Sequence, residues 1–162
     1  MISKVQIKNF KSLRSVKLDA RRVNLFIGEP NAGKSNFVEA LSLFAGELWA
    51  QLKQVVRFRV TADLFFDQKV TQSLTVDLDG NRLQLIFQDG AYAGNVEGVW
   101  GSNRFNMNHQ ELQHWGGSLK SPIRCYRFRS GLQFANPQPG ALSQPFGDNL
   151  ASVLYSNEAL RQ

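Results

Sequence analysis

Hydrophobic and polar positions alternate near the start of the chain. In residues 2–8, Val5 and Ile7 fall on one side of an extended backbone and polar side chains fall on the other. The alternation breaks at residues 11–15 and resumes in residues 16–20. A period of two is typical of a half-buried strand. The pattern therefore predicts two antiparallel strands joined by a bend.

The next apolar segment has a different pattern. Residues 23–27, VNLFI, are almost continuously apolar, which predicts a strand buried on both faces in the middle of a sheet. Beyond residue 35 the apolar positions recur at helical spacing, which predicts an amphipathic helix facing that sheet. Its apolar positions are Phe37, Leu41, Phe44 and Leu48. Glu39 and Glu47 are expected on its other faces.

The middle of the chain returns to strand-like patterns. Residues 55–60 alternate, and residues 74–78 and 83–87 predict a hairpin around the turn-forming sequence at residues 79–81. Residues 89–117 are rich in glycine and asparagine, and there we expect one short strand at 96–100.

The remaining segments are predicted from shorter patterns. We expect a loop or a short helix at residues 109–114 and a strand at 121–131. A proline-containing loop follows at 135–149, and a capped helix follows that loop.

A glycine-containing loop connects the predicted strand at residues 23–27 to the predicted helix. Residues 28–35, GEPNAGKS, match the pattern G-x-x-x-x-G-K-[ST] at every fixed position. Gly28 and Gly33 permit backbone angles that let successive N–H groups turn inward as an anion site. Lys34 places an ammonium against phosphates, and Ser35 offers a hydroxyl to Mg²⁺. The motif and its context predict nucleotide binding.

Composition adds only broad limits. The chain has 162 residues, enough for one domain with a core, and a net charge of +6 that permits but does not establish polyanion binding. Cys125 is the only cysteine, so no internal disulfide can form. Neither a signal peptide nor an apolar run long enough to span a membrane is apparent. We expect a cytoplasmic protein with no membrane partner.

The groups that complete a P-loop ATPase are not evident. Such a site needs an acidic residue at the end of a second buried strand, and a group that orients water. Asp77 and Asp89 are the nearest candidates, but both fit the predicted hairpin better. The catalytic residues therefore remain unknown at this stage.

The arrangement of motifs resembles a known group of ATPases. The combination VQIKNFKSLRSVKL … VNLFIGEPNAGKSNFVEAL, together with GDNLASVL at residues 147–154, is similar to the N-terminal lobe of RecF-like and SMC-like ABC-type AAA ATPases, including the OLD-like group. The resemblance implies an α/β P-loop NTPase fold, with a mixed central sheet and an antiparallel β-subdomain. It also implies ATP and Mg²⁺ as cofactors.

The resemblance assigns roles to individual positions. It places Lys11 near the nucleotide phosphates and Ser35 on Mg²⁺, and Gln133 corresponds weakly to a glutamine that helps hold the metal. The residues expected to bind the nucleotide are Lys11, Gly28, Glu29, Pro30, Asn31, Ala32, Gly33, Lys34, Ser35 and Asn36. Hydrolysis in such families requires a C-terminal lobe and a partner head, so the resemblance implies a homodimeric ATPase.

We therefore expect residues 1–162 to form one nucleotide-binding lobe of a longer ATPase. Its parts are strands, P-loop and first helix at 1–50, a β-rich subdomain at 51–130, and a loop and C-terminal helix at 131–162. The resemblance suggests roles in DNA repair, chromosome handling or phage defence. The isolated chain is expected to bind nucleotide without efficient turnover.

Two alternatives stay open. In the first, the chain is a non-hydrolysing module that binds nucleic acid through a basic face. The arginines of that face are Arg57, Arg59, Arg124, Arg127 and Arg129. In the second, the chain is a degenerate pseudo-ATPase.

Overall fold

The computed structural model describes residues 1–45, 52–110 and 112–126, with the backbone alone given for residues 112–118. The chain divides into two compact units, Met1–Ile123 and Arg124–Gln162. Every described helix and strand belongs to the first unit. Predictions for residues 127–162, including the final helix and the roles of Arg127, Arg129 and Gln133, lie outside the described residues.

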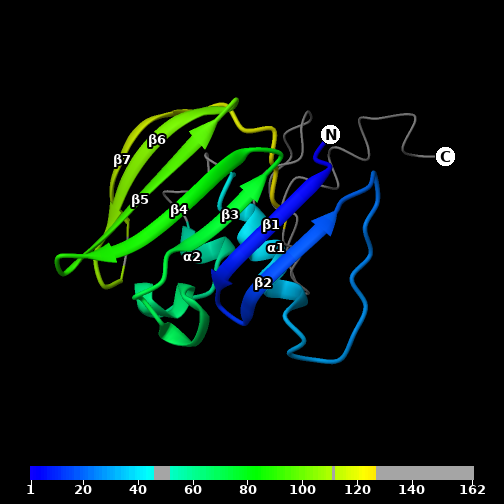
Figure 1. Cartoon of the computed structure of the whole chain (residues 1–162), viewed down its shortest axis with the longest axis horizontal. Coiled ribbons are helices and arrows are strands. Elements are labelled where there is room, and N and C mark those ends of the chain that lie inside the picture. The colour runs from blue at the N-terminus through cyan, green and yellow to red at the C-terminus, as the bar shows by residue number, and fades with distance from the viewer. Residues whose placement is uncertain (46–51, 111, 127–162) are drawn as a thin grey trace, which may run out of the picture. The chain divides into compact units, whose positions relative to one another are not determined.

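The first unit is built on a seven-stranded sheet with the order β2-β1-β3-β4-β5-β6-β7 (Figure 1). Every pair of neighbouring strands is antiparallel. The strands are β1 (Lys4–Phe10), β2 (Leu13–Asp19), β3 (Leu74–Leu78), β4 (Asn81–Gln88), β5 (Ala91–Gly98), β6 (Gly101–Met107) and β7 (Leu112–Leu119).

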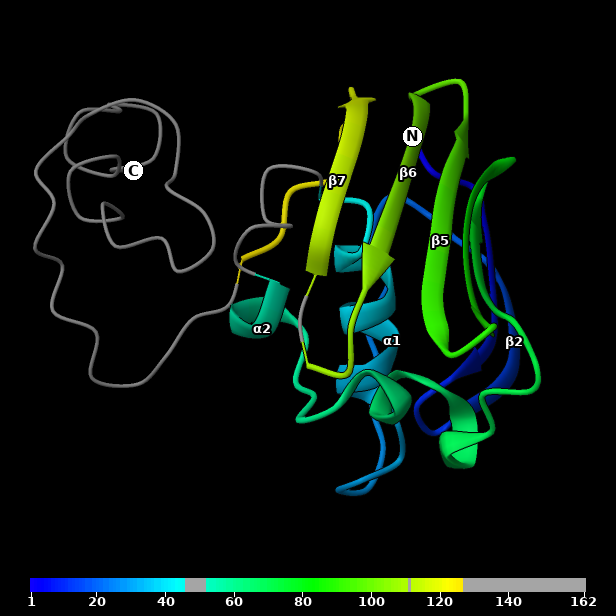
Figure 2. The same cartoon turned by 90° about the vertical axis from the view of Figure 1, so that its left-hand side faces the viewer.

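Short helices lie against one face of this sheet (Figure 2). They are the α-helices α1 (Lys34–Ser42) and α2 (Leu52–Val55), and the 3₁₀ turns η2 (Thr61–Leu64) and η3 (Phe66–Gln68). Phe37 and Ala40 of α1 are buried with Val5 and Ile7 of β1 in the core. The inward side chains of β3 and β4 extend the same core. The core therefore holds the helix that follows the P-loop.

The hairpins predicted from alternation are confirmed. Residues 11 and 12 connect β1 to β2, and β3 pairs with β4 through Asp79 and Gly80. These two turn residues have φ values of 51° and 83°. Two positive φ values match the twist that a two-residue hairpin loop needs. Asp79 also accepts hydrogen bonds from the backbone N–H groups of Ser3 (2.8 Å) and Lys4 (2.7 Å), which attaches the hairpin to the start of β1.

The predicted strand at residues 23–27 is wrong for the described structure. The segment belongs to no strand, and Val23, Leu25 and Ile27 are 82%, 81% and 84% exposed. The physical reason is the lack of lateral partners, because the described residues place no strand beside it. Asn24 instead closes a local turn, accepting from the N–H of Arg21 at 3.0 Å and donating to its carbonyl at 2.7 Å.

The predicted mixed sheet is consequently not confirmed, since its parallel part depended on residues 23–27. The β-rich region is also not a separate layer, because β1 pairs with β3 and joins the first hairpin to the rest of the sheet. An α/β arrangement of helices on one sheet face remains. The subdivision at residues 50 and 130 stays a prediction.

Two local predictions fail for different reasons. The alternating segment at residues 55–60 is not a strand, because α2 ends at Val55 and both Val55 and Val56 are buried. The loop or short helix predicted at 109–114 is wrong for residues 112–114, which lie in β7. The strand predicted at 96–100 is confirmed in part, because residues 96–98 are the end of β5, which begins already at Ala91. The glycine in β5 concealed this pattern, because Gly94 lies opposite Phe105. A Cβ atom at Gly94 would lie 2.2 Å from that ring, so glycine makes room for the aromatic side chain.

The predicted helix after the loop is confirmed in part. It begins at Lys34 and ends at Ser42, and Phe37 and Phe44 are buried as expected. Leu48 and Glu47 lie outside the described residues. Glu39 was expected on a solvent face and is instead only 6% exposed. The next subsection gives the reason.

Candidate functional site

The loop at residues 28–35 leads into the N-terminus of α1. Gly33 is the residue that precedes the helix, and its φ of +89° lies in the left-handed region. A Cβ atom there would lie 3.0 Å from Ser12 Oγ and 3.1 Å from Leu13 Cδ2. Glycine at position 33 therefore permits both the left-handed backbone angle and the close approach of the β1–β2 turn. Gly28, in contrast, does not have a positive φ.

The side chain of Lys34 closes the loop on itself. Its ammonium donates to the carbonyl oxygens of Gly28 at 2.8 Å and Glu29 at 2.6 Å. An ammonium has three N–H donors. Two of them hold the loop, and among the contacts described the third has no acceptor. The cation is therefore fixed at the centre of the loop rather than free in solvent.

The N-terminus of α1 adds backbone donors at the same place. The first intrahelical bond runs from the N–H of Phe37 to the carbonyl of Gly33 at 2.9 Å. By helical geometry the N–H groups of the preceding residues 34–36 have no intrahelical acceptor. No side chain caps them. Free N–H groups, the helix dipole and the Lys34 ammonium together make a site for an anion such as phosphate.

Ser35, the residue predicted to bind Mg²⁺, lies at the start of α1. Ser35 is exposed on the first turn of α1, directly after Lys34. Among the described residues, no group of three or more histidine, cysteine or acidic side chains is arranged to hold a metal ion. The hydroxyl of Ser35 and phosphate oxygens are hard oxygen ligands of the kind Mg²⁺ uses with few protein ligands. The residues present thus fit a metal held jointly with a bound phosphate.

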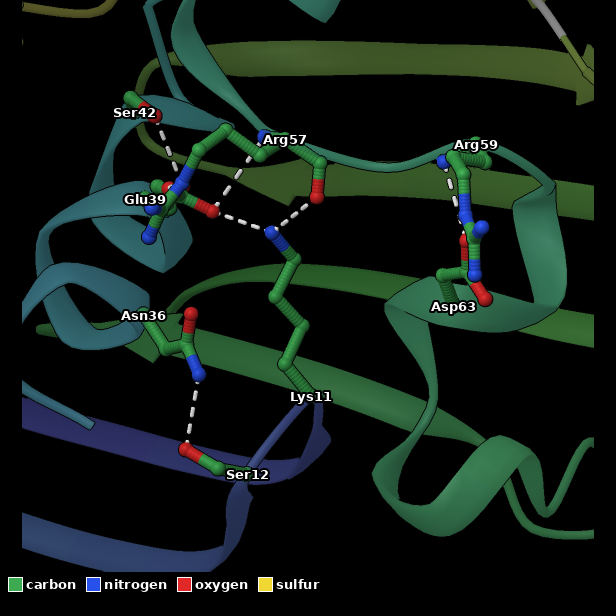
Figure 3. A network of polar contacts seen from close by, with 8 residues as sticks. All are labelled: Lys11, Ser12, Asn36, Glu39, Ser42, Arg57, Arg59 and Asp63. Carbon is green, nitrogen blue, oxygen red and sulfur yellow. Dashed lines mark hydrogen bonds and ion pairs between the residues drawn. The ribbon is translucent and has the colours of Figure 1, made fainter. Parts of the chain in front are cut away.

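The β1–β2 turn is attached to α1 by polar contacts (Figure 3). The Asn36 amide donates to Ser12 Oγ at 2.7 Å. The ammonium of Lys11 pairs with the Glu39 carboxylate and donates to the carbonyl of Arg57. Glu39 also accepts from Arg57 Nε at 2.6 Å. Lys11, predicted to approach phosphates, is thus held by α1 and by the segment after α2.

Burial explains why this cluster needs its charges paired. The Lys11 and Glu39 side chains are only 9% and 7% exposed. Burial lowers the pKa of Lys11, and the hydrogen bond and charge of Glu39 oppose that change. Glu39 therefore favours the charged form of Lys11, which burial alone would make easier to deprotonate. Nothing in the spacing of residues 34–42 pointed to this role, since an acidic residue on a helix is usually solvent-exposed.

Five of the ten residues predicted to bind nucleotide line two separate hollows, and the other five line neither. Ala32, Gly33 and Lys34 line one of about 270 Å³, beside apolar side chains of β2 and of residues 26 and 27. Lys11 and Asn36 line another of about 440 Å³. The second hollow is completed by Arg57, Asp63, Phe65, Asp67 and Gln68. The two hollows adjoin the first turn of α1 through Lys34 and Asn36.

The proposed basic face receives mixed support. Arg57 is paired with Glu39, although its side chain remains 55% exposed. Backbone N–H groups of Val60 at 3.1 Å and Arg59 at 2.9 Å donate to Asp63, and these hydrogen bonds lower the pKa of that carboxyl. Arg57 and Arg59 lie on a segment without strand structure, so they do not form the alternating face that the sequence suggested.

No helix in the described part of the chain is long and apolar enough to cross a lipid bilayer.

Comparison with known proteins gives one family match and three partial matches to curated proteins. The profile of a family described as the AAA ATPase domain matches residues 1–90. An OLD nuclease of Thermus scotoductus is 28% identical over 123 residues, which cover 75% of this chain and 22% of that protein. An ATP/GTP phosphatase of Helicobacter pylori is 46% identical over 48 residues, covering 29% of this chain and 13% of that protein.

An uncharacterised protein of Methanocaldococcus jannaschii is 44% identical over 45 residues, covering 27% of this chain and 20% of that protein. The chain therefore spans about a fifth or less of the length of these curated relatives. No solved structure matches the chain.

Proposed function

The chain belongs to the AAA ATPase domain family, and from this premise we propose that the loop at residues 28–35 binds the phosphates of ATP together with Mg²⁺. The observation that carries the proposal is the position of Lys34, whose ammonium is fixed inside the loop at the N-terminus of α1. A cation surrounded by unpaired backbone N–H groups is suited to a polyphosphate. Asn31, at φ 63°, and Gly33 shape the turns of this loop.

Each part of the proposed site has a distinct task. The N–H groups of residues 34–36 donate hydrogen bonds to phosphate oxygens, and the third N–H of Lys34 donates to the same group. Ser35 supplies a hydroxyl to the metal, which when bound neutralises phosphate charge. Glu29, Pro30 and Ala32 provide the exposed backbone that surrounds the phosphates. This division of tasks is that of a binding site and does not include a residue that activates water.

We further propose that hydrolysis is completed by a part of a longer protein. Among the described residues, no group of three or more histidine, cysteine or acidic side chains is arranged to hold a metal ion, and no carboxylate forms an ion pair with Lys34. The apolar face formed by Val23, Leu25 and Ile27 leads directly into the loop and is exposed in this chain. An exposed apolar face of this kind is suited to a covering partner, and the curated relatives are several times longer than the segment they share with this chain. A C-terminal lobe and a second head are the proposed partners.

Two of the curated relatives are named OLD nuclease and ATP/GTP phosphatase. We propose that the longer protein is a dimeric ATPase that acts in DNA repair, chromosome handling or phage defence. The alternative of a DNA-binding module without nucleotide is weaker, because Arg57 pairs with Glu39 and the segment of Arg57 and Arg59 has no strand structure.

ATP hydrolysis by a longer protein containing this chain tests the proposal. We expect steady phosphate release by that protein, and loss of release by more than about a hundredfold in Lys34→Ala, since Lys34 contacts the phosphates where charge develops. Lys120→Ala is the matched control, because it removes a lysine outside the loop. Full activity in Lys34→Ala would contradict the proposal, and absent activity with retained ATP binding would favour the pseudo-ATPase.

A further inference from the structure

A buried carboxylate on α1 has a place in the site that ATP binding alone does not explain. Glu39 lies five residues after Lys34, and its side chain is 7% exposed. One oxygen pairs with the Lys11 ammonium, and the other accepts from Arg57 Nε at 2.6 Å. Figure 3 shows the three side chains converging from the β1–β2 turn, α1 and the segment after α2. Glu39 is thus the point at which three separate segments meet.

The contacts around Glu39 fix the β1–β2 turn against the P-loop helix. Lys11 has a φ of 48°, and its backbone N–H donates to the carbonyl of Leu64 at 2.9 Å. Ser12, the next residue, accepts from Asn36 at 2.7 Å. The turn is therefore held at its backbone, at Ser12 and at the Lys11 ammonium. Only the last of these contacts depends on charge.

The hollow beside Lys11 is lined by side chains of both charges. Two cations, Lys11 and Arg57, share the Glu39 carboxylate, and both line the 440 Å³ hollow. Two acidic side chains line it as well. Asp63 accepts from two backbone N–H groups and from Gln68, and Asp67 pairs with Lys69 at 2.9 Å. The Lys11 ammonium therefore lies beside a hollow that Asn36 also lines, two residues after Lys34.

We infer that Glu39 is a positioning residue, which holds the Lys11 ammonium charged and in place so that it can attract the phosphate anion bound at the N-terminus of α1. This inference depends on the proposed function, because the anion is the nucleotide phosphate. Glu39 does not itself contact the ligand, since a carboxylate would repel it. It acts through Lys11, whose ammonium it pairs with beside α1.

Titration of the 162-residue chain with ATP and Mg²⁺ in a calorimeter tests the inference. We expect Glu39→Gln and Lys11→Met each to weaken ATP binding by about tenfold, the effect of one charge-assisted contact. The decisive variant combines Lys11→Met with Glu39→Gln. The double variant removes both buried charges of the Lys11–Glu39 pair, whereas each single variant leaves one of these charges without its partner. Asp77→Asn, which breaks the Arg82 ion pair on β3 and β4, is the control and should bind ATP as the unchanged chain does.

The double variant separates positioning from structural support. If Glu39 acts through Lys11, the double variant unfolds at a denaturant concentration close to that of the unchanged chain but binds ATP as weakly as Lys11→Met alone. If Glu39 only stabilises the fold, the double variant recovers both stability and ATP affinity, which would overturn the inference. A folded Glu39→Gln protein with unchanged affinity would overturn it as well.

Lys34→Ala keeps the two proposals distinguishable. Loss of binding in Lys34→Ala with unchanged binding in Lys11→Met refutes the role of Glu39 and leaves the proposed function standing. Unchanged binding in Lys34→Ala refutes the proposed function itself.

Discussion

Two isoleucines of this chain show how differently similar apolar patterns can end. Ile7 in β1 is fully buried, between neighbours in β2 and β3. Ile27, in the segment before the P-loop, is 84% exposed. Both lie in sequences that predict strands. The difference teaches that an apolar pattern specifies a need for burial, while partners elsewhere in the chain determine whether that need is met.

The largest expected effect comes from replacing these two residues in parallel. Ile7→Ala should lower the free energy of unfolding by about 3 kcal/mol, because it leaves a cavity in a packed core. Ile27→Ala should change it by less than about 0.5 kcal/mol, as for other exposed positions. Urea denaturation of the 162-residue chain measures both. In a longer protein that buries residues 23–27, Ile27→Ala should become costly, and equal costs already in this chain would contradict the comparison.

A second substitution tests how tightly the paired region is packed. Gly94→Ala places a methyl group 2.2 Å from the Phe105 ring, so we expect a loss of about 2 kcal/mol from overpacking. Adding Phe105→Leu to Gly94→Ala should recover part of that loss, because the ring that causes the clash is gone. Thermal unfolding monitored by circular dichroism would show this order. A Gly94→Ala protein as stable as the unchanged chain would contradict the packing of β5 against β6.

A smaller effect is expected at the segment that leads to the 3₁₀ turn η2. Asp63 accepts hydrogen bonds from the N–H groups of Arg59 at 2.9 Å and Val60 at 3.1 Å. Asp63→Ala should lower stability by about 1 kcal/mol, the usual cost of losing such a cap. Chemical denaturation measures the change, and Asp67→Ala serves as the exposed control. Equal effects of the two substitutions would argue against a special role for Asp63.

The smallest effect concerns pH and the first strand. Hydrogen bonds from the Ser3 hydroxyl and from backbone N–H groups lower the pKa of Asp79 below its ordinary value of 3.8. Its contribution to stability is therefore fully present above that value and is lost as the pH falls toward the folded-state pKa. Stability measured from pH 6 to pH 2 should fall less steeply for Asp79→Asn. A steeper fall in the variant would contradict the assigned hydrogen bonds.

Part of this structure follows from local sequence alone. Alternation identified β1 and β2, and Asp79 with Gly80 identified the β3–β4 hairpin, because strand period and turn chemistry are both local. The start of α1 directly after the glycine-containing loop was likewise predictable from residues 28–35. The phosphate site that the motif indicates in that loop stays a prediction.

Other features depend on contacts that no local pattern contains. The strands β5 and β6 were obscured by Gly94, whose purpose is visible only beside Phe105. The exposure of residues 23–27 reflects absent neighbours among the described residues. Glu39 is buried because Lys11 and Arg57, 28 and 18 positions away in sequence, neutralise it. Such pairings between distant residues are set by the fold rather than by neighbouring residues.

Direct binding of ATP is the measurement closest to the central claim, that the loop around Lys34 holds a nucleotide. Calorimetric titration of the 162-residue chain with ATP and Mg²⁺ should show one site per chain. Lys34→Ala should weaken that binding by at least about tenfold, since it removes a charged contact to phosphate. Lys120→Ala should bind as the unchanged chain does. Equal ATP affinity in the unchanged chain and in Lys34→Ala would contradict the account.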